Sequence, residues 1–436
     1  MIDHRHPDAA PVTTGDATIE IDLGAPDFAD RSFDHFARLR AACPIHRALF
    51  TDRAGENGQF GAFVGHPLWA TTGYDATSAA LLDDRFGVDL YALQPPEALP
   101  PVARTREFQI FSRNLLALDP PAHTRLRKLV QPSFTQSAIA AWAPRIQRIA
   151  DDLLDAAERA AVDRGEIAPD RSIELIAAFA FPLPITVIFE LLGVPLADRE
   201  RIGAMTETLL VASPGDEAMA ATLRPFIDYA AELVAAKRRR PAGDLLSQLI
   251  AAEADGDRLS EDELLSMILL LILAGHVTTV NLIGNGVFAL LTHPAERAKL
   301  AANPESIGGA VEETLRFWGP VEVASERYAK ADVEFAGAEI AQSDMVLPIL
   351  AAANRDPARF PDPDRFDITR PDAHRHIAFG KGIHACLGAP LARLEGRIAL
   401  GTLFGRYPEL RLDAEPDALV WRSAVLRSLG RLPVRF

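Results

Sequence analysis

The chain has 436 residues, of which 48% are hydrophobic and 24% charged, so it is long enough to bury a large core. Its formal net charge of −15 argues against a nucleic-acid-binding protein, because contact with phosphates needs a positive field. Only two residues are cysteine, which argues against a disulfide framework and fits a reducing cytosol. Residues 1–30 are charged throughout and contain no apolar signal core, so a cytoplasmic protein is expected.

In chain order, the first predicted elements are short strands. They fall at 47–50, 61–64 and 68–72, and a proline-rich loop follows at 94–101. Helical periodicity then predicts helices over 124–130, 138–161, 172–192, 219–239, 260–291 and 307–317. The C-terminal part adds strands at 332–335 and 345–349, a helix over 390–404, and strand and turn over 426–436. No repeat or linker divides the chain, so we expect one mainly α domain with minor β over residues 1–436.

The most apolar stretch, 264–291, is long enough to cross a bilayer. Five polar side chains interrupt it: His276, Thr278, Thr279, Asn281 and Asn285. Because polar groups inside a membrane are costly, a buried central helix is favoured over a membrane anchor.

A glycine-rich loop with a solitary cysteine is the strongest chemical signal. It runs FGKGIHACLG from Phe379 to Gly388, and a helix with proline in its first turn follows. The glycines allow close approach of the backbone to a flat group. The free N–H groups of the following helix stabilise a thiolate at Cys386, which would suit an axial ligand to haem iron. A buried structural cysteine is the plainer alternative, and it leaves the glycine spacing unexplained.

This loop resembles the cysteine-ligand loop of the cytochromes P-450 at every fixed position. The resemblance implies the triangular, mainly helical P-450 fold with haem b between this loop and the long central helix. It assigns Cys386 as the iron ligand and Phe379 as the residue packed beside the sulfur. It also assigns His384 to a haem propionate, and Gly388 belongs to the same cofactor-binding loop.

Three further segments match the family in order along the chain. Glu313 and Arg316 correspond to its Glu-x-x-Arg pair, which normally meets an arginine downstream; the resemblance points to Arg355. The segment DPPAHTRLR supplies His123 and Arg127 as propionate contacts, and Arg327 resembles a third. Alone, each of these would be an ordinary ion pair or basic helix face.

The central helix contains Ala274-Gly275-His276-Val277-Thr278-Thr279, which resembles the family's oxygen-binding groove. The pattern predicts that the helix opens here, since a threonine hydroxyl can divert a backbone carbonyl. Ala274, Gly275 and Thr278 are the expected catalytic positions. Val277 stands where the family has an acid, so the usual proton route is in question.

The resemblance implies a monooxygenase that inserts one oxygen atom from O2 into an apolar small molecule, by hydroxylation or epoxidation in secondary metabolism. Ferredoxin with an NAD(P)H-dependent reductase is the implied electron supply. Residues expected at the substrate lie in 88–116 and at Ala274, His276, Val321–Ala324 and 424–426, with Val323 and Val425 among them. The segment 279–286 is most similar to enzymes that tailor macrolides and other polyketides.

Alternatives remain open at this stage. Because Val277 replaces the family's acid, a peroxygenase or a redox-neutral haem-thiolate enzyme is one alternative. A haem-based binding or sensor protein is the alternative from another class. A zinc site formed by His374, His376, His384 and Cys386 has unusual spacing, and the nucleotide-like GNGVFA at 284–289 lies inside a helical run without a preceding strand.

Overall fold

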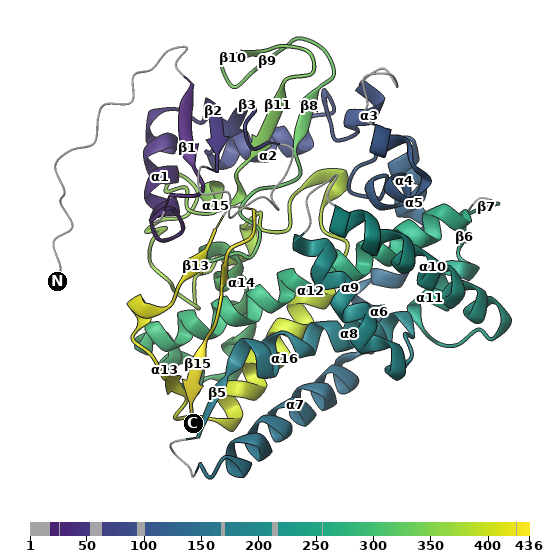
Figure 1. Ribbon diagram of the computed structural model, residues 1–436. Coiled ribbons are helices and arrows are strands. Elements are labelled where there is room, and N and C mark those ends of the chain that lie inside the picture. Colours follow the sequence, from purple (N-terminus) through teal and green to yellow (C-terminus); the bar gives the residue numbers. More distant parts are fainter. Residues whose placement is uncertain are drawn as a thin grey trace.

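The computed structural model describes residues 18–25, 27–52, 63–93, 101–166, 171–211, 217–254, 256–423 and 425–436. Figure 1 shows a mainly helical molecule in which α12 (Glu261–Thr292) passes through the middle. The larger strands gather on one side of it, next to α1 (Phe28–Ala42) and α2 (Tyr74–Leu82). This is the mainly α fold with minor β that the sequence predicts.

The other α-helices include the predicted ones, in the predicted order, and several that the sequence analysis did not predict. They are α3 (Leu90–Leu93), α4 (Arg106–Ser112), α5 (Ala122–Val130), α6 (Gln136–Ala140), α7 (Ala143–Asp163), α8 (Pro182–Leu192), α9 (Arg199–Val211), α10 (Glu217–Arg239), α11 (Leu245–Ala251), α13 (Pro294–Ala302), α14 (Ile307–Phe317), α15 (Leu350–Ala353) and α16 (Ala389–Arg406). The predicted helix over 307–317 is confirmed at both ends.

The main sheet has six strands in the order β1-β2-β3-β11-β8-β4. Their bounds are β1 Ile19–Asp22, β2 Ile45–Thr51, β3 Pro67–Thr71, β4 Phe86–Gly87, β8 Arg327–Ala329 and β11 Met345–Pro348. β11 pairs with β3 in parallel, with Leu347 opposite Ala70, and with β8 in antiparallel. The sheet therefore brings the segment around Arg327 next to strands from the N-terminal part of the chain.

Smaller sheets complete the fold. β5 (Ser172–Glu174) pairs with β15 (Pro433–Arg435), which also pairs with β12 (Arg411–Leu412). The remaining pairs are β6 (Glu253–Ala254) with β7 (Asp257–Arg258), β9 (Val333–Phe335) with β10 (Ala338–Ile340), and β13 (Trp421–Arg422) with β14 (Ser428–Leu429). Of the strand predicted at 61–64, residues 61 and 62 lie outside the described residues, and Val64 forms an isolated bridge with Phe50. The predicted loop at 94–101 is described only at Pro101.

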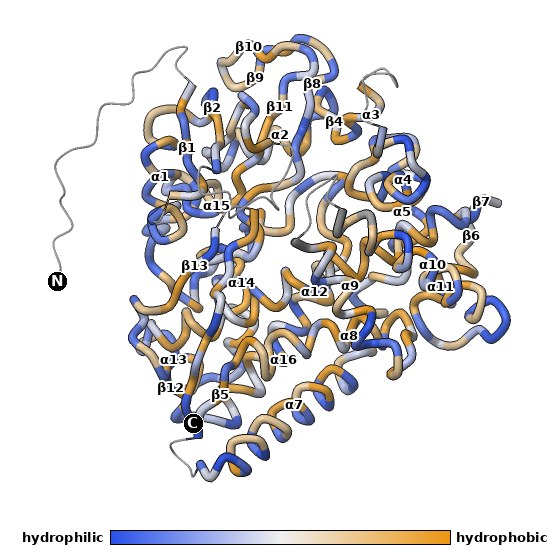
Figure 2. Tube along the Cα trace, viewed as in Figure 1, coloured by the Kyte–Doolittle hydropathy of each residue, from blue (hydrophilic) through white to orange (hydrophobic). Residues whose placement is uncertain are grey.

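Helix α12 begins with the predicted capping box. The Ser260 hydroxyl accepts from the Glu263 N–H at 3.3 Å, and the Glu263 carboxylate accepts from the Ser260 N–H at 2.8 Å. By length and composition this helix could cross a membrane, but 61% of its most apolar stretch is buried inside the protein. Figure 2 shows apolar residues along α12 and the helices around it. It is the core helix that the sequence predicts.

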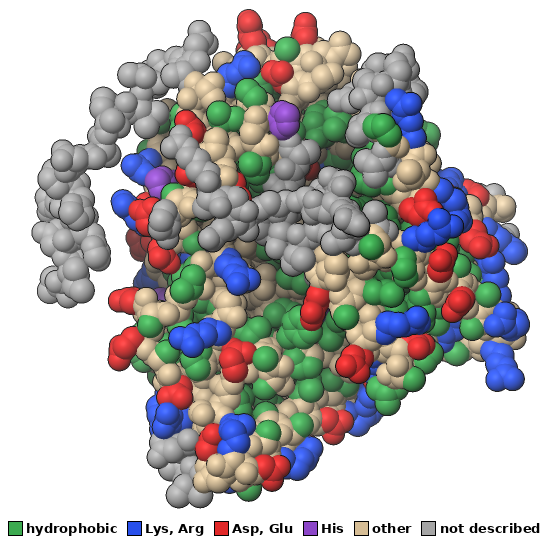
Figure 3. All heavy atoms as spheres, viewed as in Figure 1, with side chains coloured by type: hydrophobic (Ala, Val, Ile, Leu, Met, Phe, Trp, Pro, Cys, Tyr) green, Lys and Arg blue, Asp and Glu red, His purple; other side chains and the backbone are tan. Residues whose placement is uncertain are grey.

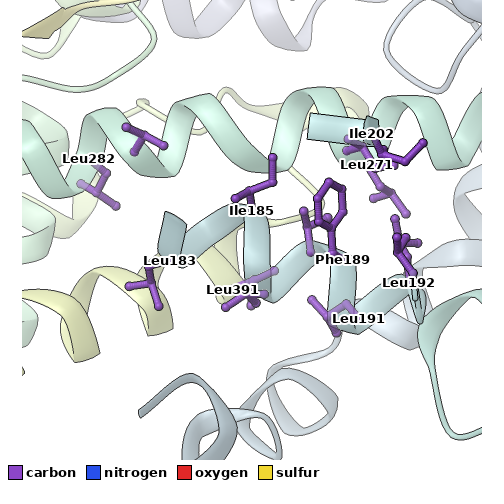
Figure 4. Packing of buried hydrophobic residues seen from close by; sticks show 14 of the residues in the cluster. Leu183, Ile185, Phe189, Leu191, Leu192, Ile202, Leu271, Leu282 and Leu391 are labelled. Carbon is purple, nitrogen blue, oxygen red and sulfur yellow. The ribbon is translucent and has the colours of Figure 1, made fainter. Parts of the chain in front are cut away.

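Packing between α8, α12 and α16 fixes the position of α12. Figure 4 shows Ile185 and Phe189 of α8 directed toward α12, while Leu391 reaches from α16. Leu183, Leu192 and Leu282 in the same cluster are at most 1% exposed. Full burial of a leucine side chain contributes about 1.5–3 kcal/mol, so this cluster holds α12 firmly against α16.

Two helix predictions are wrong in part. The segment 172–192 is not one helix, because Ser172–Glu174 pairs with β15, and a π-helical turn at Ile176–Ala180 precedes α8. Pro182, which lacks an N–H, starts α8 afresh. The segment 138–161 divides into α6 and α7 near Trp142, with Pro144 in the first turn of α7. Long-range pairing and proline thus override helical periodicity.

Candidate active site

The glycine-rich loop forms a tight backbone structure just before α16. Cys386 N–H donates to Phe379 O at 2.9 Å, and Ala385 N–H donates to Gly382 O at 3.1 Å. Gly380 and Gly382 have φ of 68° and 73°, which glycine adopts without strain. A Cβ at Gly382 would also meet Leu81 O at 2.8 Å. The two glycines are therefore required by the shape of the loop.

The thiol of Cys386 lies at the N-terminal end of α16. Burial raises its pKa, while N–H groups of Gly388 and Ala389 that bond the sulfur, together with the charges of Arg127 and Arg393, act in the opposite direction. The residue is nevertheless exposed, because the sulfur faces a cavity inside the protein. A sulfur with N–H donors behind it and open space in front suits a metal-bound thiolate.

The cavity has a volume of about 480 Å³, within the range of small-molecule sites. The Cys386 loop lines it together with one face of α12, including Ala274, Gly275 and Thr278. Most of the lining surface is apolar. The basic side chains of the lining are His123, Arg127, Arg327, Lys381 and His384, and the other polar ones are Thr278, Thr279, Ser325 and Glu326.

Two of these polar side chains are histidines without partners. The rings of His123 and His384 lie 4.3 Å apart between centroids, and none of their four nitrogens finds a hydrogen-bond partner among the described residues. Burial lowers the pKa of His123, and burial together with Arg327 lowers that of His384 to about 3. Buried polar nitrogens are normally bonded, so they call for a ligand with acceptor oxygens.

Two arginines complete this polar end of the cavity. Arg127 donates to Ala385 O at 2.8 Å, which ties α5 to the cysteine loop. Arg327 is 4% exposed and donates to Ser325 O at 2.9 Å, and burial lowers its pKa to about 10. The charges of Asp119 and Glu326 act on Arg327, but no salt bridge joins it to a carboxylate among the described residues, so its guanidinium can bind an anion in the cavity.

Together these features fit haem b. The group is flat, apolar and bears two carboxylates, and the cavity offers an apolar space, a thiol and a cationic end. Cys386 would hold the iron, and His123, Arg127, Arg327 and His384 would hold the propionates. Phe379, which packs beneath the guanidinium of Arg393 at 4.6 Å, supports the loop. The residues that the resemblance implied are thus brought to one cavity.

Helix α12 is continuous through the segment expected to open. The Thr278 hydroxyl donates to Ala274 O at 2.9 Å, and the Thr279 hydroxyl lies 3.4 Å from Gly275 O. These bonds add to the helical ladder without breaking it, so the predicted opening is wrong for this structure. Thr278 nevertheless lines the cavity with Ala274 and Gly275.

The predicted substrate-facing residues divide into two groups. Val321, Val323, Ala324 and Val425 line the cavity, as do Leu115 and Leu116 from the predicted 88–116 segment. Residue 424 lies outside the described residues. His276 does not line the cavity; it is fully buried and packs edge-on against Phe181 at 4.4 Å. That prediction was wrong because His276 points to the side of α12 that packs on α8.

Glu313 and Arg316 form the pair that the sequence predicts, and the structure shows that it is buried and that its third member differs. Glu313 and Arg316 make two hydrogen bonds of 2.7 Å, and both side chains are fully buried. Arg370 reaches Glu313 at 3.3 Å. Arg355 instead donates to Phe317 O at 2.9 Å and pairs with Asp364 at 2.7 Å. The sequence analysis missed Arg370, because this residue lies in a segment without a helix or strand whose periodicity could have placed it near Glu313.

Basic side chains on α5 and α16 are partly neutralised by carboxylates. Arg125 pairs with Asp257 at 3.0 Å and with Glu263, and Arg393 pairs with Glu312 at 2.6 Å. Of the residues in the zinc alternative, His376 lies 3.2 Å from the carboxylate of Glu312. Among the residues that the structure describes, no group of three or more His, Cys, Asp or Glu is placed to hold a metal ion.

Comparison with known proteins gives a consistent result. The cytochrome P450 family model matches residues 216–426. The chain is 44% identical to the cytochrome P450 monooxygenase PikC of Streptomyces venezuelae over 95% of its length and 94% of the relative. It is 43% identical to 6-deoxyerythronolide B hydroxylase of Saccharopolyspora erythraea over 95% and 98%. The solved structure of the polyketide synthase cytochrome P450 PksS of Bacillus subtilis superimposes with a TM-score of 0.84 at 38% identity, covering 95% and 99% of the two chains.

These relatives extend over nearly the whole chain, well beyond the segment matched by the family model. Their similarity and the residues gathered in the cavity agree on cofactor and chemistry. The protein belongs to the cytochrome P450 family and is a haem b-dependent monooxygenase.

Proposed function

We propose that this enzyme hydroxylates or epoxidises an apolar small molecule, of the macrolide or polyketide kind, in secondary-metabolite biosynthesis. The observation that carries the proposal is the single cavity that Cys386 and Thr278 both line, with valine and leucine side chains around the remaining space. The names of relatives, among them a 6-deoxyerythronolide B hydroxylase, support a polyketide substrate. We place the enzyme in the cytoplasm.

Haem b bound at Cys386 supplies the activation of O2. The chain's own residues do the rest: the Gly388 and Ala389 N–H groups stabilise the thiolate, and His123, Arg127, Arg327 and His384 orient the carboxylates. Apolar walls exclude water from the oxidised carbon. The substrate is held by shape, because few polar groups line its part of the cavity.

Proton delivery falls to Thr278 and ordered water. Val277 can neither donate nor accept a proton. Thr278 and Thr279 of α12 both line the cavity, and the hydrogen bond from the Thr278 hydroxyl to Ala274 O fixes the position of its oxygen. His276 cannot assist, because burial lowers its pKa to about 4 and its ring faces Phe181.

Substitution Cys386→His tests the site directly. The wild-type protein should bind haem, and its reduced carbon monoxide complex should show the strongly red-shifted absorption band of thiolate ligation. The variant should lose that band. The other cysteine, Cys43, offers a matched control, and Cys43→Ser should keep it. A band that survives in Cys386→His would overturn the assignment. Turnover with hydrogen peroxide but not with reduced ferredoxin would instead establish a peroxygenase.

We further propose that an acidic ferredoxin delivers the electrons at the surface next to the cysteine loop. Ile383 and Leu82 are 49% and 60% exposed there, and a Cβ on Gly382 would lie 3.3 Å from Leu82, so the two segments are adjacent. Arg397 is exposed on α16, and its side chain donates to the Arg393 carbonyl at 3.3 Å without forming a salt bridge among the described residues. Apolar contact with flanking cations is complementary to an acidic partner.

Charge reversal tests this surface, because the face of the molecule drawn in Figure 3 carries charges of both signs and no single-sign field guides a partner there. Arg397→Glu should slow reduction by ferredoxin, with a weaker effect at high salt, and leave substrate-induced spectral shifts unchanged. Arg31→Glu on α1 is the control. Equal reduction rates in both variants would exclude Arg397 from the docking surface.

A further inference from the structure

A buried ion pair lies directly behind the cavity wall. Glu322 and Arg427 are 1% and 2% exposed, and the Arg427 Nη1 lies 3.5 Å from the Glu322 Oε1. The Ser423 hydroxyl donates to the other oxygen of Glu322. Burial raises the pKa of Glu322 and lowers that of Arg427. Removing two charges from water is costly, so a buried pair by itself is weak evidence for a gain in stability.

The pair sits between residues that face the cavity. Val321 and Val323, on either side of Glu322, line the cavity, whereas Glu322 does not. Val425 lines the cavity two residues before Arg427. Each charged residue thus belongs to a segment whose apolar side chains line the cavity: Glu322 to the segment with Val321 and Val323, and Arg427 to the segment with Val425.

Backbone hydrogen bonds join the two wall segments to each other. Glu322 N–H donates to Val425 O at 2.8 Å, and Arg427 N–H donates to Pro320 O at 2.9 Å. Between these bonds Val321 and Leu426 form an antiparallel bridge. The ion pair closes the same connection through side chains, so the segments 320–325 and 425–427 form one unit.

Further contacts fix this unit to the helices. Arg427 Nη1 donates to Ala29 O at 3.0 Å and to the Ser32 hydroxyl at 3.2 Å on α1. Its guanidinium also lies 4.2 Å from the Trp421 ring centroid. Asn285 of α12 donates to Arg427 O at 3.2 Å. Asn285 lies two helical turns beyond Thr278, so the network ties the wall to the helix that presents Thr278.

We propose that the Glu322–Arg427 pair sets the position of Val321, Val323 and Val425 relative to α12, and so determines which substrates fit and which carbon is oxidised. Both are positioning residues, since neither lines the cavity. This inference rests on the proposed function. The inference adds two residues that influence substrate specificity without contacting the substrate.

Two azole ligands of different size give the test on the haem-loaded enzyme. Imidazole binds the iron without reaching the walls, whereas 4-phenylimidazole places its ring in the substrate space. Glu322→Gln should weaken 4-phenylimidazole by about fivefold, the size of one ordinary hydrogen bond, and change imidazole less than twofold. The exposed Glu339→Gln on β10 is the control. Loss of general stability would weaken both ligands alike.

Ser423→Ala provides a milder second variant that keeps both charges. It should shift the ratio of the two dissociation constants in the same direction by a smaller factor. An unchanged ratio in Glu322→Gln overturns the inference, and if that variant does not bind haem, an unchanged ratio in Ser423→Ala does so. Failure of the wild-type protein to bind haem through thiolate would instead refute the proposed function.

Discussion

The two sides of the haem cavity differ in how they are held. On the cysteine side, backbone hydrogen bonds inside one short loop, two glycines with positive φ and a buried Glu313–Arg316 pair fix the geometry. On the α12 side, the cavity is bounded by apolar side chains from segments far apart in the chain, and polar contacts lie behind the wall. The first side positions the cofactor, and the second shapes the space for the substrate.

This difference indicates on which side of the cavity amino-acid substitutions are tolerated. The cysteine side serves one fixed group, so any displacement affects iron ligation. The α12 side serves a substrate that varies between relatives, so its apolar lining can change while the network behind it maintains the frame. Three predictions test this contrast, beginning with the largest expected effect.

Removing a buried charge on the cysteine side should be severe. Glu313→Ala leaves Arg316 and Arg370 without their carboxylate, and loss of one partner of a buried pair costs about 3–5 kcal/mol. Asp262→Ala, which breaks an exposed pair with Arg106 at the start of α12, should cost at most about 1 kcal/mol. Urea unfolding of both haem-loaded variants measures the difference. If both variants lose the same free energy of unfolding, the buried pair on the cysteine side contributes no more to stability than an exposed pair.

Glu395 on α16 provides a pH-dependent test of the same side. It is 1% exposed, its Oε2 has no partner among the described residues, and burial raises its pKa from 4.5 to about 8. Between pH 4.5 and 8 the unfolded chain releases this proton and the folded protein keeps it, so stability falls as pH rises. At about 1.4 kcal/mol for each pH unit above 4.5, the cost at pH 7 is at most about 3.5 kcal/mol.

Glu395→Gln should therefore raise the free energy of unfolding at pH 7 and have little effect near pH 4.5. The exposed Glu409→Gln, nearby in sequence, serves as the control. Unfolding curves at several pH values measure both. If Glu395→Gln destabilises the protein equally at every pH, the carboxyl group has a hydrogen-bond partner that it needs in either protonation state.

The smallest effect concerns the α12 side. Thr278→Ala removes the hydroxyl that lines the cavity and should lower the product formed per NAD(P)H oxidised by about fivefold, with hydrogen peroxide rising in its place. Val277→Glu restores an acid at the family's position and should change this ratio less than twofold. Product, NAD(P)H and peroxide are measured together. Unchanged coupling in Thr278→Ala would mean that protons reach the site by another path.

The sequence by itself determined the cysteine loop, the Glu313–Arg316 pair and the capped core helix. In each case the interacting residues are close in the chain, so spacing alone places them on one loop, one helix face or one helix end. The need for glycine in the loop could also be predicted from the sequence, because the positive φ angles are a local property of the loop backbone. The mainly helical fold followed from periodicity over long segments.

Only the tertiary structure decided how distant segments meet. Arg370, and not Arg355, reaches Glu313; His276 turns to Phe181 and away from the cavity; Ser172–Glu174 becomes a strand because β15 lies beside it. The Glu322–Arg427 pair joins residues that are 105 positions apart in the sequence. Such contacts depend on which buried surfaces pack together, and burial is a property of the whole fold that no local pattern of residues encodes.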